Sequence, residues 1–253
     1  MFSVEDRDRL TSALVAAARL DGRVNAAALL GSTAAGDQDR WSDVDLALSV
    51  AADADEKAVI AEWTERMYDQ HGAVHHLDVA SGGGLYRAFL LANGLQVDLS
   101  FWAEAQFRAT SPRFRLVFGE PGGTPRAAAD PAIDELIGEG WLYALHAQRC
   151  IARGRPWQAE HMIGGARDRV LALACVRHGL PARYGRGFDD LPATVTVALV
   201  SALVASLQRE ELNRALRATV AALVVETEQA DPELAGRLAN PLGEIAGAQR
   251  ARG

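Results

Sequence analysis

The sequence is poor in the features that mark several common classes of protein. Only two of its 253 residues are cysteines, Cys150 and Cys175, and both lie in apolar stretches with helical spacing. This argues against a disulfide-stabilised scaffold and predicts two buried free thiols in a reducing cytoplasm. The longest uncharged apolar stretch, residues 193–207, is too short to span a bilayer and indicates a buried helix, so no membrane partner is expected. Acidic side chains near the N-terminus argue against the basic region of a signal peptide.

Positive charge is also scarce. Lys57 is the single lysine among 26 basic residues, which are outnumbered by 33 acidic ones, and the net charge is −7 with a pI near 5.4. The acidic excess lies entirely within residues 1–132, because residues 133–253 carry equal numbers of acidic and basic side chains. Nucleic-acid binders need a cationic surface, so a nucleic-acid partner is not expected. An acidic surface attracts a cationic small molecule instead.

The most informative residues lie between positions 31 and 46. Gly31-Ser32 follows an apolar run at 26–30, and Asp43 and Asp45 open a second run at 44–50. Side chains two apart on a strand point to one face, so the two carboxylates should be neighbours. They would repel each other unless a cation lay between them, and hard oxygen ligands favour Mg²⁺. The preceding turn can offer N–H groups and a hydroxyl to a phosphate. The alternative is a plain acidic loop between two strands.

A third carboxylate is expected from a later β-hairpin. Residues 86–91 and 95–101 have strand patterns, and Asn93-Gly94 between them predicts a type I′ turn. In the returning strand, four apolar side chains share one face, and Asp98 shares the other face with Gln96. Alone, Asp98 would be a solvent-facing strand residue. If it lies beside the first aspartate pair, as the family resemblance described next implies, the three carboxylates make a two-metal site with cations about 3.5–4 Å apart.

Gly-Ser followed by Ser-Asp-x-Asp, here Gly31-Ser32 and residues 42–45, resembles the signature of the nucleotidyltransferase superfamily that includes DNA polymerase β. The antibiotic-modifying members of the kanamycin nucleotidyltransferase type are especially similar. The resemblance implies that Gly31 and Ser32 hold the β- and γ-phosphates of ATP. It also implies that Asp43 and Asp45 bind Mg²⁺, and that Asp98 completes the site where an acceptor hydroxyl is activated.

The sequence departs from this family pattern at one point. Many antibiotic-type members have an arginine before the second glycine of the motif, where this chain has Ala34-Ala35-Gly36. Eight arginines between positions 149 and 186 are candidates to replace that charge, because arginine is the preferred phosphate ligand. Among them we select Arg167 and Arg186 for the triphosphate. A solvated basic helix face is the alternative for each.

The chain divides near Pro131 into two parts with different patterns. Residues 1–130 alternate helix and strand patterns, whereas every segment of residues 131–253 has a helix pattern. The expected fold is therefore α+β, with an N-terminal mixed-sheet nucleotidyltransferase domain at 1–130 and an all-α helical bundle at 131–253. The antibiotic-modifying relatives have this arrangement.

The resemblance also implies a general base early in the helical half. Kanamycin-type enzymes have a glutamate there, and residues 136–141 are similar in position and pattern, so Glu139 is the candidate and Glu135 the reserve. Gly138 and Gly140 flank Glu139 inside the predicted helix and could make room for a substrate. A solvent-exposed helix glutamate is the alternative.

Together these features predict an Mg²⁺-dependent enzyme that transfers AMP from ATP to a hydroxyl of a small, cationic molecule and releases pyrophosphate. Aminoglycoside or lincosamide antibiotics are the leading acceptor candidates. Two alternatives are kept: an antitoxin-type protein adenylyltransferase that acts on a helical toxin partner, and a catalytically inactive interaction protein of the same fold. The long helical half favours a self-contained substrate cleft, and the three intact aspartates speak against an inactive protein.

Overall fold

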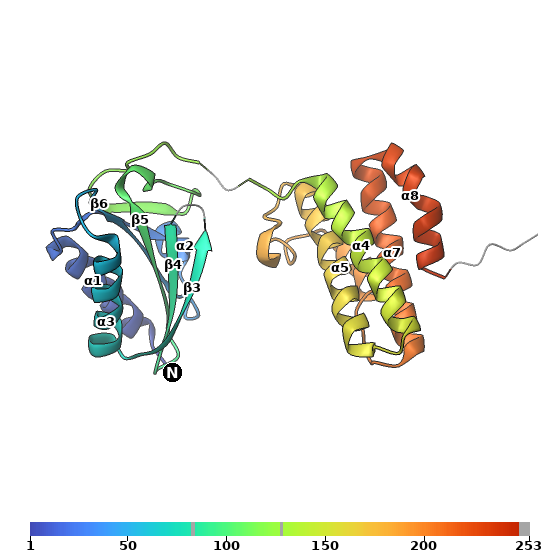
Figure 1. The fold of residues 1–253 in the computed structure, drawn as a ribbon, viewed down its shortest axis with the longest axis horizontal. Coiled ribbons are helices and arrows are strands. Elements are labelled where there is room, and N and C mark those ends of the chain that lie inside the picture. The colour runs from blue at the N-terminus through green and yellow to red at the C-terminus, as the bar shows by residue number, and fades with distance from the viewer. Residues whose placement is uncertain (82–83, 127–128, 248–253) are drawn as a thin grey trace, which may run out of the picture. The chain divides into compact units, whose positions relative to one another are not determined.

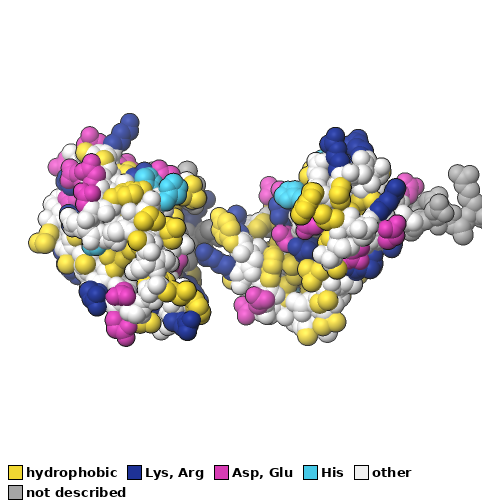
Figure 2. All heavy atoms as spheres, turned by 90° about the horizontal axis from the view of Figure 1, so that it is seen from below, with side chains coloured by type: hydrophobic (Ala, Val, Ile, Leu, Met, Phe, Trp, Pro, Cys, Tyr) yellow, Lys and Arg dark blue, Asp and Glu magenta, His cyan; other side chains and the backbone are white. Residues whose placement is uncertain are grey.

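The computed structural model describes residues 1–81, 84–126 and 129–247 (Figure 1). The chain forms two compact units, Met1–Ala128 and Ala129–Gly253. Within the described residues, the first unit is built on a six-stranded mixed sheet and the second contains only helices, which confirms the expected α+β class. Charged side chains of both signs are interspersed on the surfaces that Figure 2 presents. In the described ranges, no helix combines the length and the apolar character needed to cross a membrane.

The N-terminal unit alternates helices and strands along the chain. Its elements are α1 (Val4–Leu20), β1 (Val24–Leu30), α2 (Gly31–Ala35), β2 (Val44–Val50), α3 (Glu56–His71), β3 (Ala73–Ser81), β4 (Gly84–Leu91), β5 (Gln96–Ala103), η1 (Glu104–Gln106) and β6 (Phe114–Phe118). The strand order in the sheet is β3-β4-β5-β2-β1-β6. Strands β2 and β5 are parallel, and the other neighbouring strands described are antiparallel.

One face of this sheet is covered by α1 and α3, which Figure 1 shows on the same side. The alternation of strand residues places Leu46 of β2 and Leu99 of β5 against Leu14 of α1 and Trp63 of α3, all of them fully or almost fully buried. Residues of the opposite parity therefore point to the other face of β2 and β5. That face carries only a small core around Trp102, so polar side chains can remain accessible there.

The C-terminal unit is a bundle of long helices. Its elements are α4 (Ile133–Ala152), α5 (Pro156–His178), η2 (Arg183–Gly185), α6 (Ala193–Val200), α7 (Arg209–Ala230) and α8 (Pro232–Ile245). Helices α4, α5 and α7 share one apolar core, to which Cys150 and Cys175 contribute. Both cysteines are buried free thiols, as their apolar sequence context predicted.

The prediction of one helix over residues 193–207 is wrong, because α6 ends at Val200. The guanidinium of Arg214 on α7 donates hydrogen bonds to the backbone carbonyls of Ser201 and Leu203, the second at 2.7 Å. These two carbonyl groups accept hydrogen bonds from Arg214, whereas in a longer helix they would accept them from backbone N–H groups. The apolar composition of the stretch contains no sign of this distant partner.

The hairpin between β4 and β5 is also not the predicted type I′ turn. That turn needs positive φ at both central residues, whereas only Gly94 has one, at 86°. The Gly94 N–H donates to the carbonyl of Leu91 at 2.9 Å, and the Leu91 N–H donates to the carbonyl of Leu95 at 2.9 Å. The connection is therefore a three-residue loop that ends in a left-handed glycine, and the strands on either side keep the expected pairing.

Candidate active site

Strand register brings the three predicted aspartates together. Asp45 on β2 is directly opposite Asp98 on the parallel strand β5, and Asp43 lies two residues before Asp45. One carboxylate oxygen from each residue lies within 4.8 Å of the others, and all three residues are half-buried. The sequence predicted that the carboxylates share a face, and the parallel pairing of β2 with β5 makes them converge.

A glycine is required at the start of the motif turn. Gly31 begins α2 with φ at +58°, in the left-handed region that favours glycine. A Cβ atom at this position would collide with the Oδ2 atom of Asp45. A side chain at residue 31 would force the Asp45 carboxylate to move, so the glycine lets the turn that carries Ser32 lie against Asp45 in its observed position.

The electrostatics of Asp98 fit a cation site. Burial raises the pKa of the Asp98 carboxyl above its ordinary value, and the negative charge of Asp43 acts in the same direction. The side-chain amide of Gln96 opposes this shift by donating hydrogen bonds to both carboxylate oxygens, at 3.0 and 3.1 Å. A hard divalent cation would relieve the same crowding of charge, and three convergent carboxylates are a donor set that Mg²⁺ accepts.

Two further residues lie beside the aspartates. Gln96 shares the face of Asp98, as the period of the strand predicted, but its hydrogen bonds to the Asp98 carboxylate were not part of the prediction. Tyr86 on β4 is opposite Ser100 on β5 and lies edge-on to the Trp102 ring, with 5.8 Å between the ring centroids. Burial, and then the charge of Asp45, raise the pKa of the Tyr86 hydroxyl above its ordinary value. Only the register between β4 and β5 reveals Tyr86 as a neighbour of the site.

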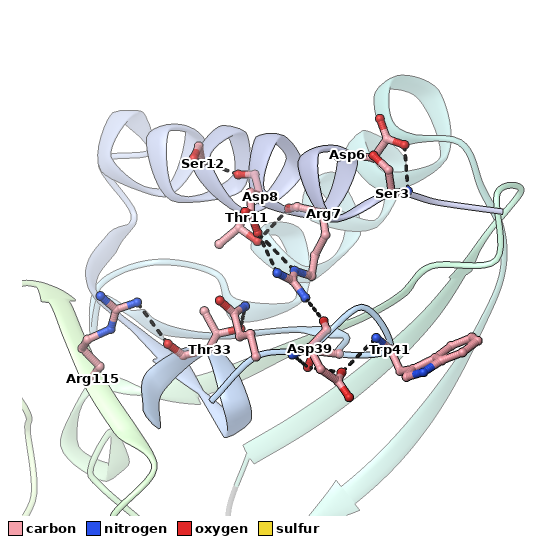
Figure 3. A network of polar contacts seen from close by, with 12 residues as sticks. Ser3, Asp6, Arg7, Asp8, Thr11, Ser12, Thr33, Asp39, Trp41 and Arg115 are labelled. Atoms are coloured by element: carbon pink, nitrogen blue, oxygen red, sulfur yellow. Dashed lines mark hydrogen bonds and ion pairs between the residues drawn. The ribbon is translucent and has the colours of Figure 1, made fainter. Parts of the chain in front are cut away.

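The loop that leads into Asp43 is fixed to α1 (Figure 3). Arg7 of α1 is 2% exposed and donates a hydrogen bond of 2.5 Å to the backbone carbonyl of Asp39. The Asp39 carboxylate accepts hydrogen bonds from the backbone N–H of Trp41 at 2.9 Å and from the Ser42 hydroxyl at 3.0 Å. These bonds hold the pKa of Asp39 below its ordinary value. The loop is thus anchored on both sides immediately before the first metal-ligand candidate.

Helix α2 has its own anchors on the side of β6 (Figure 3). Arg115 of β6 donates a hydrogen bond of 3.2 Å to the carbonyl of Thr33, and the Gln38 amide donates one of 2.7 Å to the Thr33 hydroxyl. Both contacts act on the residue that follows Ser32. They restrain the short helix to which the sequence assigned phosphate binding.

In the C-terminal unit, Glu139 of α4 forms an ion pair with Arg169 of α5. The Arg169 guanidinium also lies over the ring of Tyr143, with 5.4 Å to the centroid. Glu139 and the reserve candidate Glu135 line the same cavity of about 470 Å³, together with Asp168 and Arg169. The side chain of Glu139 is half-exposed to this cavity and oriented by its arginine partner.

The two glycines that flank Glu139 have different surroundings. A Cβ atom on Gly138 would meet no atom within 4 Å, which agrees with an open face. A Cβ atom on Gly140 would lie 2.9 Å from a methyl group of Leu223, so Gly140 allows α4 to pack closely against α7. The interpretation of Gly140 as space for a substrate is therefore wrong.

Many arginines of the basic stretch have partners within the helical unit. Arg177 binds both carboxylate oxygens of Glu226, at 2.9 and 2.7 Å. Arg183 donates to the carbonyl of Ala129. Arg167 makes a longer ion pair of 3.6 Å with its neighbour Asp168, and the Arg186 guanidinium lies 5.8 Å from the ring centroid of Tyr184. The assignment of Arg167 and Arg186 to the triphosphate stays a prediction.

Comparison with known proteins gave matches among solved structures only. No protein-family model and no curated protein sequence matches the chain. An aminoglycoside 6-adenyltransferase from Bacillus subtilis is similar at 14% identity over 95% of this chain and 98% of that chain, with a TM-score of 0.41. A nucleotidyltransferase-like protein from Exiguobacterium sibiricum 255-15 is similar at 12% identity over 87% of this chain and 77% of that chain, with a TM-score of 0.37. Because both TM-scores are below 0.5, we derive the function from the site itself.

Proposed function

We propose that this chain is an Mg²⁺-dependent nucleotidyltransferase that transfers AMP from ATP to a hydroxyl group of a small-molecule acceptor and releases pyrophosphate. The observation that carries the proposal is the convergence of Asp43, Asp45 and Asp98 from two parallel strands, with one oxygen of each within 4.8 Å. Exposed acidic residues are often clustered without function. Here, however, the three aspartates are half-buried, and Gly31 in the neighbouring turn lies directly against the Asp45 carboxylate.

Asp43 and Asp45 would hold the metal ions, and Asp98 would complete the site on the side of the acceptor. Bound there, Mg²⁺ would neutralise part of the triphosphate charge and favour ionisation of the attacking hydroxyl. The chain's own groups supply positioning. Gly31 and Ser32 would hold the β- and γ-phosphates, and the Gln96 amide donates hydrogen bonds to both oxygens of the Asp98 carboxylate. Phosphoryl transfer depends mainly on such positioning and charge neutralisation.

The proposed general base is Glu139. The acceptor hydroxyl loses its proton as it attacks the α-phosphorus, and a carboxylate in hydrogen-bond reach is a common acceptor for that proton. Arg169 fixes the orientation of Glu139 within its cavity. Arg167 and Arg186 are proposed to neutralise the triphosphate, since the motif itself lacks an arginine at Ala35.

The acceptor is proposed to be cationic, in the manner of an aminoglycoside. The cavity of the helical unit is lined by three carboxylates, from Glu135, Glu139 and Asp168, and by two guanidinium groups, from Arg169 and Arg183, so one acidic charge is in excess. The acidic excess of the chain lies in the half that bears the aspartates. Both features favour a positively charged molecule over an anionic one.

The test uses ATP labelled in either the α- or the γ-phosphate, with Mg²⁺ and a panel of aminoglycosides, lincosamides and bacterial lysate. We expect the α-label in a small-molecule product and the γ-label in pyrophosphate. Transfer of the γ-label to the acceptor, or transfer that persists in EDTA, would overturn the proposal. An α-label on a lysate protein would identify the antitoxin-type alternative, and no transfer to any component would favour the inactive interaction protein.

A matched pair of variants connects this activity to the aspartates. Asp45→Asn should reduce transfer by more than about 10²-fold, because even the loss of a residue that only supports a metal ligand costs about 10–100-fold. Asp69→Asn removes an equally charged but exposed carboxylate from α3, which covers the other face of the sheet, and should leave transfer unchanged. Equal rates in the two variants would separate the activity from the carboxylate cluster.

A further inference from the structure

The two outer strands of the sheet are protected very differently against pairing with another chain. Within the described residues, β3 and β6 form the two edges of the sheet. Strand β6 has five residues, follows Pro112 and Arg113, carries Arg115, and pairs with β1 through an irregular register. Short length, proline, basic side chains and bulges are the usual devices that keep an edge strand from pairing with a second sheet.

Strand β3 is less protected: it shares with β6 one register irregularity, between Ala73 and His75, but from His75 onward its pairing with β4 is regular. It runs for nine residues from Ala73 to Ser81 without proline, lysine or arginine (Figure 1). Its apolar side chains are unusually exposed: Val74 at 56%, Leu77 at 62% and Val79 at 46%. On the face of the N-terminal unit that Figure 2 presents, hydrophobic and histidine side chains lie next to one another. A long, apolar edge of this kind is a template for strand addition.

The one charged residue of β3 does not oppose such pairing. Asp78 is bound by both donor nitrogens of the Arg87 fork, at 2.6 and 2.7 Å, and Arg87 holds its pKa below the ordinary value. The neighbouring His76 has its Nδ1 atom 2.9 Å from the Tyr68 hydroxyl. When Tyr68 donates this bond, Nε2 of His76 carries a proton that is available to a second partner.

We propose that β3 is a homodimer interface, at which the β3 strands of two copies pair antiparallel about Leu77 and extend the sheet across a two-fold axis. In this register Leu77 faces the partner's Leu77, and His75 faces the partner's Val79. His76 then lies directly opposite the partner's Asp78, and the two-fold axis creates this complementary contact twice. An isologous interface needs such self-complementarity, and the sequence of β3 supplies it.

This inference does not depend on the proposed activity, because it rests on the edge of the sheet and not on the aspartates. The first experiment measures the mass of the full chain in solution by sedimentation over a range of concentrations. We expect a species of twice the 27.0 kDa chain mass. A chain that is monomeric throughout the micromolar range would overturn the proposal.

Charge at the centre of the interface should separate the copies. Leu77→Lys places two ammonium groups opposite each other, and like charges in directly opposed strand positions are destabilising. We expect the dimer dissociation constant to rise at least about tenfold, which corresponds to about 1.4 kcal/mol. The matched control is Leu116→Lys on β6, where the side chain is 39% exposed, and it should leave the dimer intact. If Leu116→Lys dissociates the dimer and Leu77→Lys does not, the interface lies elsewhere and the proposal is wrong.

A cross-link tests the register, and it remains informative if Leu77→Lys fails to fold. Directly opposed residues of antiparallel strands have Cα atoms about 4.5–5.5 Å apart, within the range that a disulfide spans. Leu77→Cys should therefore form a covalent dimer under mild oxidation, while Cys150 and Cys175 are buried and do not compete. In the same register, Val74 lies six residues, or about 20 Å, from its own counterpart, so Val74→Cys should not cross-link. Cross-linking of Val74→Cys in preference to Leu77→Cys would refute the pairing about Leu77.

Discussion

The two units of this chain hold their candidate catalytic carboxylates in different ways. In the sheet unit, Asp45 and Asp98 are placed by backbone register, since parallel pairing of β2 and β5 sets them opposite each other. In the helical unit, Glu139 is placed by a side-chain ion pair with Arg169 across two helices. Register is fixed by a whole ladder of backbone hydrogen bonds, whereas an ion pair between two half-exposed side chains is a local and individually weak restraint.

The two kinds of support suit the two proposed roles, metal ligand and general base. Metal ligands must be held within a few tenths of an ångström, and strands of a packed sheet are the more rigid support for such a site. A base that must exchange protons with a bound acceptor needs solvent access and some freedom of movement. If Glu139 is the proposed base, its ion pair with Arg169 leaves it that freedom, because both side chains are partly exposed.

The largest expected effect tests the helical side of the comparison. Glu139→Gln keeps the shape of the side chain but removes the proton acceptor, so turnover should fall by about 10²–10⁴-fold, the usual contribution of a positioned base. ATP affinity, measured by calorimetry, should change little. Glu135→Gln is the matched control, because Glu135 lines the same cavity. If Glu135→Gln loses turnover and Glu139→Gln keeps it, Glu135 is the base.

The sheet side is tested by two glycines with the same backbone geometry. Gly31 and Gly36 both have positive φ, at 58° and 76°, so Ala at either position should cost about 1–2 kcal/mol of stability. Only Gly31→Ala also drives a Cβ atom into Asp45, whereas no atom lies within 4 Å of a Cβ at Gly36. Displacing a catalytic group by about 1 Å costs on the order of 10²-fold in rate, and we expect that loss for Gly31→Ala alone.

Thermal unfolding and the steady-state rate of transfer, measured on both glycine variants, separate the two effects. Similar melting temperatures with very different rates would support the role of Gly31 in placing Asp45. Equal rates in both variants would mean that Asp45 tolerates displacement, and that the rigid positioning attributed to the sheet is not needed.

The sequence predicted much of the sheet side because its signals are local. The spacing of Asp43 and Asp45, and the parity of Asp98 with Gln96, follow from the period of a strand, and the structure agrees with both. What the spacing could not reveal is that β2 and β5 are neighbours, since this pairing joins residues far apart in the chain. Tyr86 was missed for the same reason: it borders the site through β4, one strand further from β2.

The failures of prediction share a physical cause. The sequence analysis does not single out Arg7, which is buried and donates a hydrogen bond to the backbone carbonyl of Asp39, a partner that no sequence pattern reveals. The prediction of one helix over residues 193–207 rests on apolar composition. Helix α6 ends at Val200, and Arg214 of α7 donates hydrogen bonds to the carbonyls of Ser201 and Leu203 that follow. Contacts between side chains and distant backbone groups are not visible in hydrophobic periodicity.

The arginine variants address whether the helical unit contributes to nucleotide binding. If Arg167 and Arg186 face the triphosphate, Arg167→Ala and Arg186→Ala should each weaken ATP binding by about 1.5–3 kcal/mol, the range for a hydrogen bond to a charged group. Mg²⁺ binding should be nearly unchanged. Arg183→Ala is a suitable control, because the Arg183 guanidinium already donates to the carbonyl of Ala129. Unchanged ATP affinity in both test variants would mean that Arg167 and Arg186 do not bind the triphosphate and belong to a solvated helix surface.

The smallest expected effect is on the pH dependence of stability. It compares one carboxylate from each unit. In the sheet unit, hydrogen bonds from Arg23, together with one from the indole N–H of the buried Trp63, hold the pKa of Asp21 below its ordinary value. In the helical unit, the side chain of Glu211 is 19% exposed, and its pKa is lowered to about 2, chiefly by Arg214. A carboxyl group whose pKa is lower in the folded than in the unfolded chain stabilises the fold when the pH is above its pKa in the unfolded chain. This stability is lost as the pH falls through the pKa of the folded chain.

The Glu211–Arg214 pair should nevertheless contribute less to stability, because its residues lie at i and i+3 on one helix, where an ion pair is worth about 0.2–0.5 kcal/mol. Asp21→Asn keeps an acceptor for Trp63 but loses the charge, and at pH 7 it should lower the free energy of unfolding by about 1 kcal/mol. The difference from the parent chain should shrink as pH falls below about 3.9, where Asp in the unfolded chain becomes protonated. Glu211→Gln should change the melting temperature little at any pH. Chemical denaturation of both variants between neutral and acidic pH tests this, and a larger loss in Glu211→Gln would show that the Glu211–Arg214 pair carries the acid-sensitive stability.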